Sequence, residues 1–361
     1  MTRRTPYQYL LLPLIALLAI LSLIALPARA QEAVTSGQRV SLGRGPIELW
    51  NVSGTVTLHR GSGEAALTAT AGGADGSQLR FFVDRDAALT RFRVVYPDVD
   101  AIAAPFEHSG NTNLRLREDG TFGGNDSRPN RGNEIRVGGS RGFRGYADIE
   151  LTVPEGTEVK VHLGVGRSVS ENVSGKVTID TWSADAQATS IAGEWLFDTG
   201  SGDVVVRGAR GTLRIDTGSG DATVADVSGD LLDVDTGSGQ ADATNVQVAR
   251  FRFDTGSGDV RARALQSGRG VVDTGSGNAD VEITGGTIED ILIDTGSGDA
   301  ILALPQSADA RLTIDTGSGD MTMQRSGAVL ERRDSDGMVL RFGEGRGRIK
   351  IDTGSGDVTI R

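Results

Sequence analysis

Apolar and polar residues alternate along most of this 361-residue chain, in short runs that stop at glycine-rich segments. In the stretch TLRIDTGSGDATVADVSGD, residues 212–230, Leu213 and Ile215 are separated by an arginine, and Ala222 and Val224 are separated by a threonine. Such alternation is typical of strands that bury one face. Helical periodicity is not sustained in any segment, so the pattern predicts an all-β protein.

The pattern repeats together with the phrase Asp-Thr-Gly-Ser-Gly, which occurs eight times. Successive copies lie 18 to 21 residues apart, except for a last interval of 37 residues, which indicates a coil that has lost the phrase or gained a loop. One period cannot bury its own apolar side, whereas stacked periods cover one another and pair their backbones about 4.8 Å apart. The phrase begins at Asp198, Asp216, Asp235, Asp254, Asp273, Asp294, Asp315 and Asp352, after a degraded copy at Asp180.

We therefore predict a parallel β-solenoid, or β-helix, with about 19 residues per coil. A right-handed coil is the default for parallel crossovers. A left-handed hexapeptide helix is the alternative at an 18-residue period, although intervals of 19 and 21 residues break its six-residue repeat.

Each phrase is expected to form one corner of a coil. Glycine takes positive φ there without a Cβ clash, and the threonine points inward to form a hydroxyl ladder. The aspartate is expected to cap the turn by accepting backbone N–H groups two or three residues on. In the period quoted above, these structural turn residues are Asp216, Thr217, Gly218, Ser219 and Gly220.

The phrase aspartates are expected to form one acidic column along the stack. The residues five positions after them, beginning with Asp203, form a second column that is mostly acidic. Carboxylates one coil apart repel each other by about 0.9 kcal/mol in water, so each must gain a comparable interaction. Turn capping is the favoured interpretation. The alternative is calcium bound between the columns, because hard cations need several oxygen ligands, although Gln240 and Asn278 would weaken such a site. The calcium alternative involves Asp198, Asp203, Asp216, Asp221, Asp254, Asp259, Asp294, Asp299, Asp315 and Asp320.

Asp-Thr-Gly-Ser also occurs in the catalytic loops of aspartic proteases. Such an enzyme needs two carboxylates that face each other and share a proton, whereas copies along one edge of a solenoid form a column. The three histidines, His59, His108 and His162, lie outside the regular repeat and are expected at the surface or in loops. We therefore predict no catalytic residue, no cofactor other than the calcium alternative, and no enzymatic activity.

Residues 1–30 have the order of a secretory signal peptide: arginines, an apolar run, and Ala-Arg-Ala before Gln31. An uncleaved membrane anchor is the alternative. Cleavage would leave a mature chain without a membrane span and would make the protein periplasmic, cell-surface or extracellular. The chain has no cysteine, so its stability must come from burial and backbone pairing.

The remaining chain divides into three predicted parts. Residues 31–97 alternate strongly and predict strands that form a cap or the opening coils. Residues 98–146 are rich in Gly, Asn, Arg and Asp, with too few apolar residues for a core, and predict a long mobile loop. The solenoid is predicted over residues 147–361, with an irregular excursion at 324–348 that could form a side hairpin.

The segments VSGKVTID, LTVPEGTEVKV and GRIKIDTGSGDVTI, with the repeated phrase, resemble the bacterial putative-adhesin family of β-strand repeats. That family is a domain of unknown function, similar to the head domains of putative autotransporter adhesins. The resemblance covers roughly residues 149–361. It implies a surface or periplasmic β-solenoid with adhesion proposed from its shape, and it carries over no catalytic residue.

The charge balance of 37 basic and 48 acidic residues argues against nucleic acid as a partner. Together these observations favour a non-enzymatic protein that displays a sheet face and loops to a glycan or a protein at the cell surface. One alternative is a self-assembling envelope scaffold with end-to-end association, and another is a calcium-stabilised repeat protein. A polysaccharide-acting enzyme is the least favoured, because it would need charged side chains clustered on one sheet face.

Overall fold

The computed structural model describes residues 30–103, 112–123 and 132–361. The predicted signal peptide lies outside the described residues except for Ala30. Within the described ranges, none of the helical structure is long and apolar enough to cross a membrane. The described chain is all-β, as predicted, with one 23-stranded, mostly parallel sheet and a separate four-stranded sheet.

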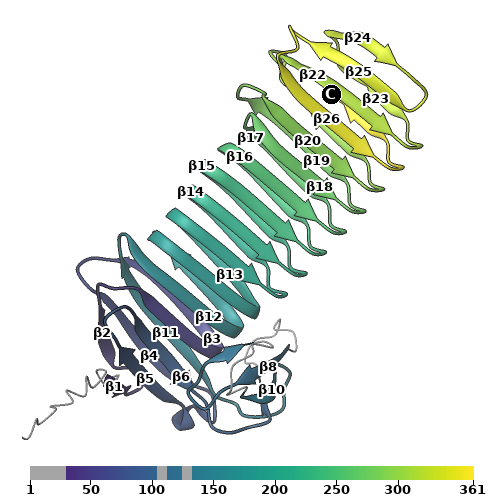
Figure 1. The fold of residues 1–361 in the computed structure, drawn as a ribbon. Helices are drawn as coiled ribbons and strands as arrows, with labels where there is room; N and C mark the ends of the chain where they lie inside the picture. The colour runs from purple at the N-terminus through teal and green to yellow at the C-terminus, as the bar shows by residue number, and fades with distance from the viewer. Residues whose placement is uncertain (1–29, 104–111, 124–131) are drawn as a thin grey trace, which may run out of the picture.

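The large sheet winds into an elongated stack of coils (Figure 1). Its first coils are long strands that continue around a corner, where Ser190, Gly208, Asp226 and Asn245 have positive φ. Later coils are divided into separate strands. The long strands are β3 (Ile47–Gly61), β12 (Thr157–Glu171), β13 (Ser174–Thr199), β14 (Val204–Thr217), β15 (Ala222–Thr236) and β16 (Ala241–Thr255).

The second half of the stack consists of shorter strands with the same inward and outward alternation. They are β17 (Val260–Gln266), β18 (Arg269–Thr274), β19 (Ala279–Gly285), β20 (Asp290–Thr295), β21 (Ala300–Ala303), β22 (Ala310–Thr316), β23 (Met321–Met323), β26 (Gly347–Thr353) and β27 (Val358–Ile360).

Identical positions of successive coils pair in register along the stack. Ile215, for example, pairs with Phe197 on one side and with Val234 on the other, and all three side chains are almost completely buried. Each coil therefore completes the core of its neighbours, which explains why one period alone cannot fold.

The order of the last coils in space differs from their order in the sequence. Strand β26 pairs in parallel with β20 on one side and with β22 on the other. Strand β27 lies in the same way between β21 and β23. The C-terminal coil is thus inserted between two coils that precede it in the chain.

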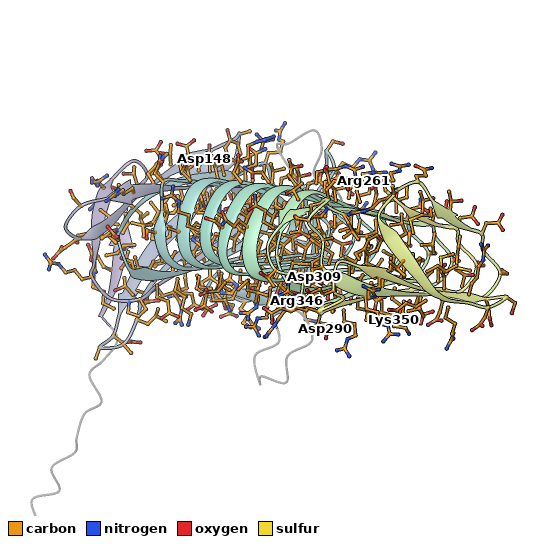
Figure 2. All side chains as sticks on the ribbon, turned by 90° about the horizontal axis from the view of Figure 1, so that it is seen from above. Asp148, Arg261, Asp290, Asp309, Arg346 and Lys350 are labelled. Carbon is orange, nitrogen blue, oxygen red and sulfur yellow. The ribbon has the colours of Figure 1, made fainter. Side chains whose placement is uncertain are left out.

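The predicted excursion at residues 324–348 explains the last interval of 37 residues. It contains a hairpin of β24 (Ala328–Arg333) and β25 (Gly337–Phe342), and β25 pairs antiparallel with the free edge of β22. The chain then crosses from one edge of β22 to the other before it enters β26. The crossing is held by Asp309, whose Oδ1 accepts the backbone N–H of Arg346 at 3.0 Å. Figure 2 labels these two residues together.

The N-terminal region forms the opposite end, mainly through antiparallel pairing. Strands β6, β5 and β1 extend from the first half of β3, and β11, β4 and β2 extend from its second half. The bounds are β1 (Ala30–Val34), β2 (Arg39–Gly43), β4 (Ala65–Gly72), the 3-10 turn η1 (Gly76–Gln78), β5 (Arg80–Arg85), β6 (Thr90–Val95) and β11 (Tyr146–Pro154).

The prediction of one long mobile loop over residues 98–146 is wrong for the described part of that segment. It forms the four-stranded sheet of β7 (Ala101–Ile102), β8 (Thr112–Leu116), β9 (Phe122–Gly123) and β10 (Asn133–Val137). The few apolar residues suffice because they share one face, where Ile102, Leu114 and Phe122 are at most 2% exposed.

Candidate functional site

The aspartates that open the eight phrases form a single ridge along one outer face of the stack. In register, Asp198 is followed by Asp216, Asp235, Asp254, Asp273 and Asp294. Asp352 and then Asp315 continue the ridge beyond Asp294, because the C-terminal coil is inserted there. We call these eight aspartates the acidic ridge.

The aspartates of the second column, which begins at Asp203, act as caps between coils, and we call this column the capping column. The backbone N–H of Asp221 donates to Oδ1 of Asp203 at 2.9 Å, and that of Gln240 donates to Oδ1 of Asp221 at 2.8 Å. The same bond continues through the inserted coil, where Asp357 donates to Asp299 at 2.9 Å. Each of these carboxylates is therefore held by the next coil.

These bonds correct the predicted capping interaction. The expected donor was a backbone N–H two or three residues on, whereas the observed donor is one register position along the stack. In the described chain, no ridge aspartate accepts a hydrogen bond from a backbone N–H of its own turn. That acceptor role falls to threonine: Oγ1 of Thr217 accepts the backbone N–H of Gly220 at 3.0 Å.

The threonines of the phrase point inward, as predicted. All eight are at most 4% exposed, and Thr199 Oγ1 donates to Thr217 Oγ1 at 3.2 Å. Several hydroxyls instead donate to the carbonyl of the second glycine of their own phrase, as Thr236 does to the Gly239 carbonyl at 2.6 Å. Because these hydroxyls are buried and hydrogen-bonded within the stack, they are poor nucleophiles.

The glycines of the phrase are required for a different reason from the predicted one. Gly218 and Gly220 do not have positive φ. A Cβ built on Gly220 would lie 2.1 Å from the carbonyl oxygen of Gly202, and one on Gly277 would lie 1.8 Å from that of Gly258. These corners stack backbone on backbone, so there is no room for a side chain. Positive φ occurs at the opposite corner.

Burial of the carboxylates, followed by repulsion from neighbouring aspartates, raises the pKa of Asp198, Asp216 and Asp294 above the ordinary value. Two cations interrupt this repulsion. Arg252 Nη1 lies 3.0 Å from Asp235 Oδ2 and also pairs with Asp254. Lys350 Nζ lies 2.8 Å from Asp352 Oδ2. The ridge is thus a row of partly compensated negative charge.

The ridge continues towards the N-terminal end through His162, which sequence reasoning placed at the surface or in a loop. His162 pairs in register with Asp180, and its Nδ1 lies 2.8 Å from Asp180 Oδ2. It is only 4% exposed because the indole of Trp50 stacks on it, with ring centroids 3.6 Å apart. The signal was present in the sequence, since His162 stands 18 residues before Asp180, at the aspartate position of an earlier coil.

Glu48 completes this cluster on the far side of the imidazole, 3.4 Å from His162 Nε2. Burial of the Glu48 carboxylate opposes its ionisation, but His162 and the Arg91 guanidinium outweigh that effect and lower the pKa of Glu48 to about 2. The carboxylates of Glu48 and Asp180 therefore hold the imidazole from both sides. The small sheet covers the cluster, because Phe122 packs edge-on against Trp50.

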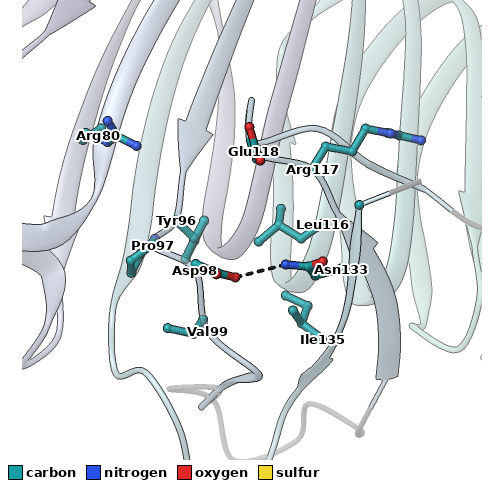
Figure 3. Close-up of a pocket in the computed structure, with 11 residues that line it drawn as sticks. Arg80, Tyr96, Pro97, Asp98, Val99, Leu116, Arg117, Glu118, Asn133 and Ile135 are labelled. Carbon is teal, nitrogen blue, oxygen red and sulfur yellow. Dashed lines mark hydrogen bonds between the residues drawn. The ribbon is translucent and has the colours of Figure 1, made fainter. Parts of the chain in front are cut away.

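A pocket lies where the end of β6 meets the small sheet (Figure 3). Asn133 Nδ2 donates to Asp98 Oδ1 at 3.1 Å across it. Arg80 and Glu118 line its walls. The described lining holds no serine, cysteine or histidine, and its carboxylates are those of Asp98 and Glu118.

The residues of the calcium alternative lie on the two sides of the phrase corner, in the ridge and in the capping column. Across residues 30–103, 112–123 and 132–361, no group of three or more His, Asp or Glu side chains is arranged to hold a metal ion. Asp203, Asp221, Asp259 and Asp299 of that set each accept a backbone N–H.

Comparison with known proteins places this geometry in context. The model of the Toastrack DUF4097 family matches residues 128–361. A search of curated proteins found no match. A solved structure, a "putative cell adhesion protein" from Clostridium sporogenes ATCC 15579, matches at 10% identity over 92% of this chain and 99% of that chain. Its TM-score of 0.19 is too low to support an inference about this chain.

Proposed function

The chain belongs to the Toastrack DUF4097 family, and from this premise we propose that it is an exported, non-enzymatic bacterial protein of the cell envelope. Its right-handed β-solenoid presents an outer sheet face and loops to a glycan or a protein at the cell surface. The fold serves as a rigid support, and recognition is carried by side chains that repeat once per coil.

The acidic ridge is the observation that supports a binding role. Its eight aspartates lie in one line instead of facing one another across a groove, so no pair can share a proton as protease carboxylates do. Side chains of the capping column accept the backbone N–H at all but one of the described phrase corners, so stacking does not require the ridge carboxylates. A row of charges that costs stability and has no structural task favours an external role.

The chemistry of the ridge favours partners with cationic groups at intervals, such as a basic protein segment or an amine-bearing glycan. Arg252 and Lys350 occur within the ridge and would limit the length of a continuous acidic stretch. Within the described chain, Asp198 and Asp216 form no salt bridge, although the charge of Lys160 acts on Asp198, and these two aspartates are the part that we expect to bind.

Immobilised residues 31–361 can be tested against a lysine-rich peptide, an amine-bearing glycan and a uronic-acid polymer. We expect reversible, salt-sensitive retention of a cationic probe, with no change in its chemistry. The variant Asp198→Asn/Asp216→Asn should bind more weakly, and the matched control Asp226→Asn, at the opposite corner, should bind normally. Equal binding by both variants, or turnover of the uronic-acid polymer, would refute the proposal.

A further inference from the structure

The C-terminal end of the stack finishes on an exposed strand whose first half is apolar. Strand β24 pairs with β25 on one edge only, and it is the outermost strand at that end (Figure 1). Its Val329 and Leu330 are 49% and 55% exposed. They are the exposed large hydrophobic residues of the described chain.

The exposed leucine belongs to a row of core residues. Leu312 pairs with Leu340, and Leu340 pairs with Leu330. The exposed fraction along that row is 0%, 4% and 55%, so the core row reaches the open end and then loses its cover. On the facing sheet, β23 is also an edge strand, and its Met321 and Met323 are only partly buried. The C-terminal end of the stack is therefore a coil whose apolar residues are not covered by a further coil.

The N-terminal end is different. Its edge strands β1 and β2 bury Val34, Val40 and Leu42, each at most 6% exposed. Glu32 and Arg39 are exposed on the same strands. Charged edge strands of this kind resist pairing with other chains. A head-to-tail contact would place the apolar C-terminal end against charge, so the two ends do not complement each other.

We propose that two copies of the chain associate through their C-terminal ends to form a closed, two-fold dimer. A two-fold contact places the same strand from each copy face to face. Antiparallel pairing centred on Leu330 sets the two leucines opposite each other and continues the core row into the partner. The second copy is the partner that fits, because the row it completes consists of the solenoid's own core positions.

The contact is expected to be short and reversible. A bulge follows Leu330 in β24, and Arg332 and Arg333 occupy the rest of the strand. Bulges and edge charges limit strand pairing, so the contact is confined to the few residues on either side of Leu330. Growth stops at two copies, because the N-terminal ends are blocked. The dimer does not depend on the proposed ligand-binding role.

Sedimentation of residues 31–361 over a wide concentration range tests this inference. We expect a reversible monomer–dimer equilibrium that the variant Val329→Lys/Leu330→Lys abolishes without lowering the melting temperature. The matched control Ala33→Lys, on the N-terminal edge strand β1, should still dimerise. Since the chain has no cysteine, Leu330→Cys, at the centre of the proposed pairing, should form an oxidative cross-link between copies, and Ser36→Cys should not.

Three results would overturn the proposal. One is a monomer at every concentration. Another is a mass that rises past the dimer, as in a head-to-tail filament. The third is a dimer that persists in the Val329→Lys/Leu330→Lys variant or that cross-links through Ser36→Cys.

Discussion

The phrase aspartates and the aspartates of the capping column affect stability in opposite ways. Asp203 accepts a backbone N–H from the next coil, so its charge is used in a hydrogen bond. Asp216 has no such donor, and its neighbours in register carry the same charge. Repulsion of about 0.9 kcal/mol per pair in water is modest alone but accumulates along a ridge. Hydrogen bonding between coils accounts for the capping column, whereas the ridge carboxylates of Asp198 and Asp216 make no such bond, and only the proposed function gives them a role.

This difference predicts how stability depends on pH. Because the folded state raises the pKa of Asp216, its contribution is most favourable below the carboxyl range and is lost as pH rises through the folded pKa. The melting temperature should therefore increase as pH falls from 7 towards about 4.5. Below that, Glu48, with its pKa lowered to about 2, begins to oppose the gain.

The variant Asp216→Asn should isolate the effect. Neutralising the side chain removes repulsion, so we expect a higher melting temperature at pH 7 in low salt and a smaller gain at pH 4.5. Thermal melts at several pH values provide the measurement. A loss of stability at pH 7 would mean that the ridge carboxylate makes a structural bond.

The second glycine of the phrase provides a sharper test of the corner. Gly220→Ala would place a methyl group 2.1 Å from the Gly202 carbonyl oxygen, so the coils would have to separate. We expect a loss of about 2–4 kcal/mol in the free energy of unfolding, measured by urea titration. Ser219→Ala, at the exposed neighbouring position, should change it by less than about 0.5 kcal/mol. Similar values for the two variants would contradict the stacking argument.

Sequence alone predicted where these residues lie better than why they are there. Alternation placed Thr217 inside correctly, because burial of one face sets a period of two. It could not identify the capping donor of Asp203, because that donor lies in another coil. It also gave the wrong reason for Gly220, since contact between coils is invisible in a single period. His162 was missed because its coil lacks the glycine phrase.

At the scale of elements, the crossing that leads into β26 depends on one carboxylate. Asp309 accepts the backbone N–H of Arg346 and pairs with its guanidinium, which lowers the pKa of Asp309 and raises that of Arg346. Asp309→Ala should release the crossing, so trypsin should cleave after Arg346 faster than in the unchanged protein. Arg348, paired with Asp290 at 2.9 Å, is the internal reference. Equal cleavage rates would show that the crossing is held by something else.

The repeated elements were predictable, and their final order was not. Phrases at Asp315 and Asp352 have the same inward and outward pattern, so either coil fits beside β20. The β24–β25 hairpin determines which coil lies beside β20, because β25 pairs with one edge of β22 and leaves only the other edge for β26. The small sheet was missed for a related reason: its apolar residues are sparse in sequence and gather on one face only when four strands meet.

At the scale of the whole molecule, the stack has two unlike ends. Charged edge strands and buried apolar residues close the N-terminal end, whereas the C-terminal end exposes part of a core row. Between them, the ridge repeats once per layer. If the two proposals hold, this polarity would limit assembly to two copies and leave a long, regular face open to a partner.

The stack has one layer per phrase, with the C-terminal coil inserted between two earlier coils, and this order can be measured directly. Ser219, Ser318 and Ser355 occupy the same exposed position of three phrases and can each be replaced by a spin-labelled cysteine. By pulsed electron spin resonance, the pair 219/355 should lie five layers apart, roughly 24 Å, and the pair 219/318 six layers apart, roughly 29 Å. A shorter distance to residue 318 than to residue 355 would contradict the inserted coil and the single ridge built on it.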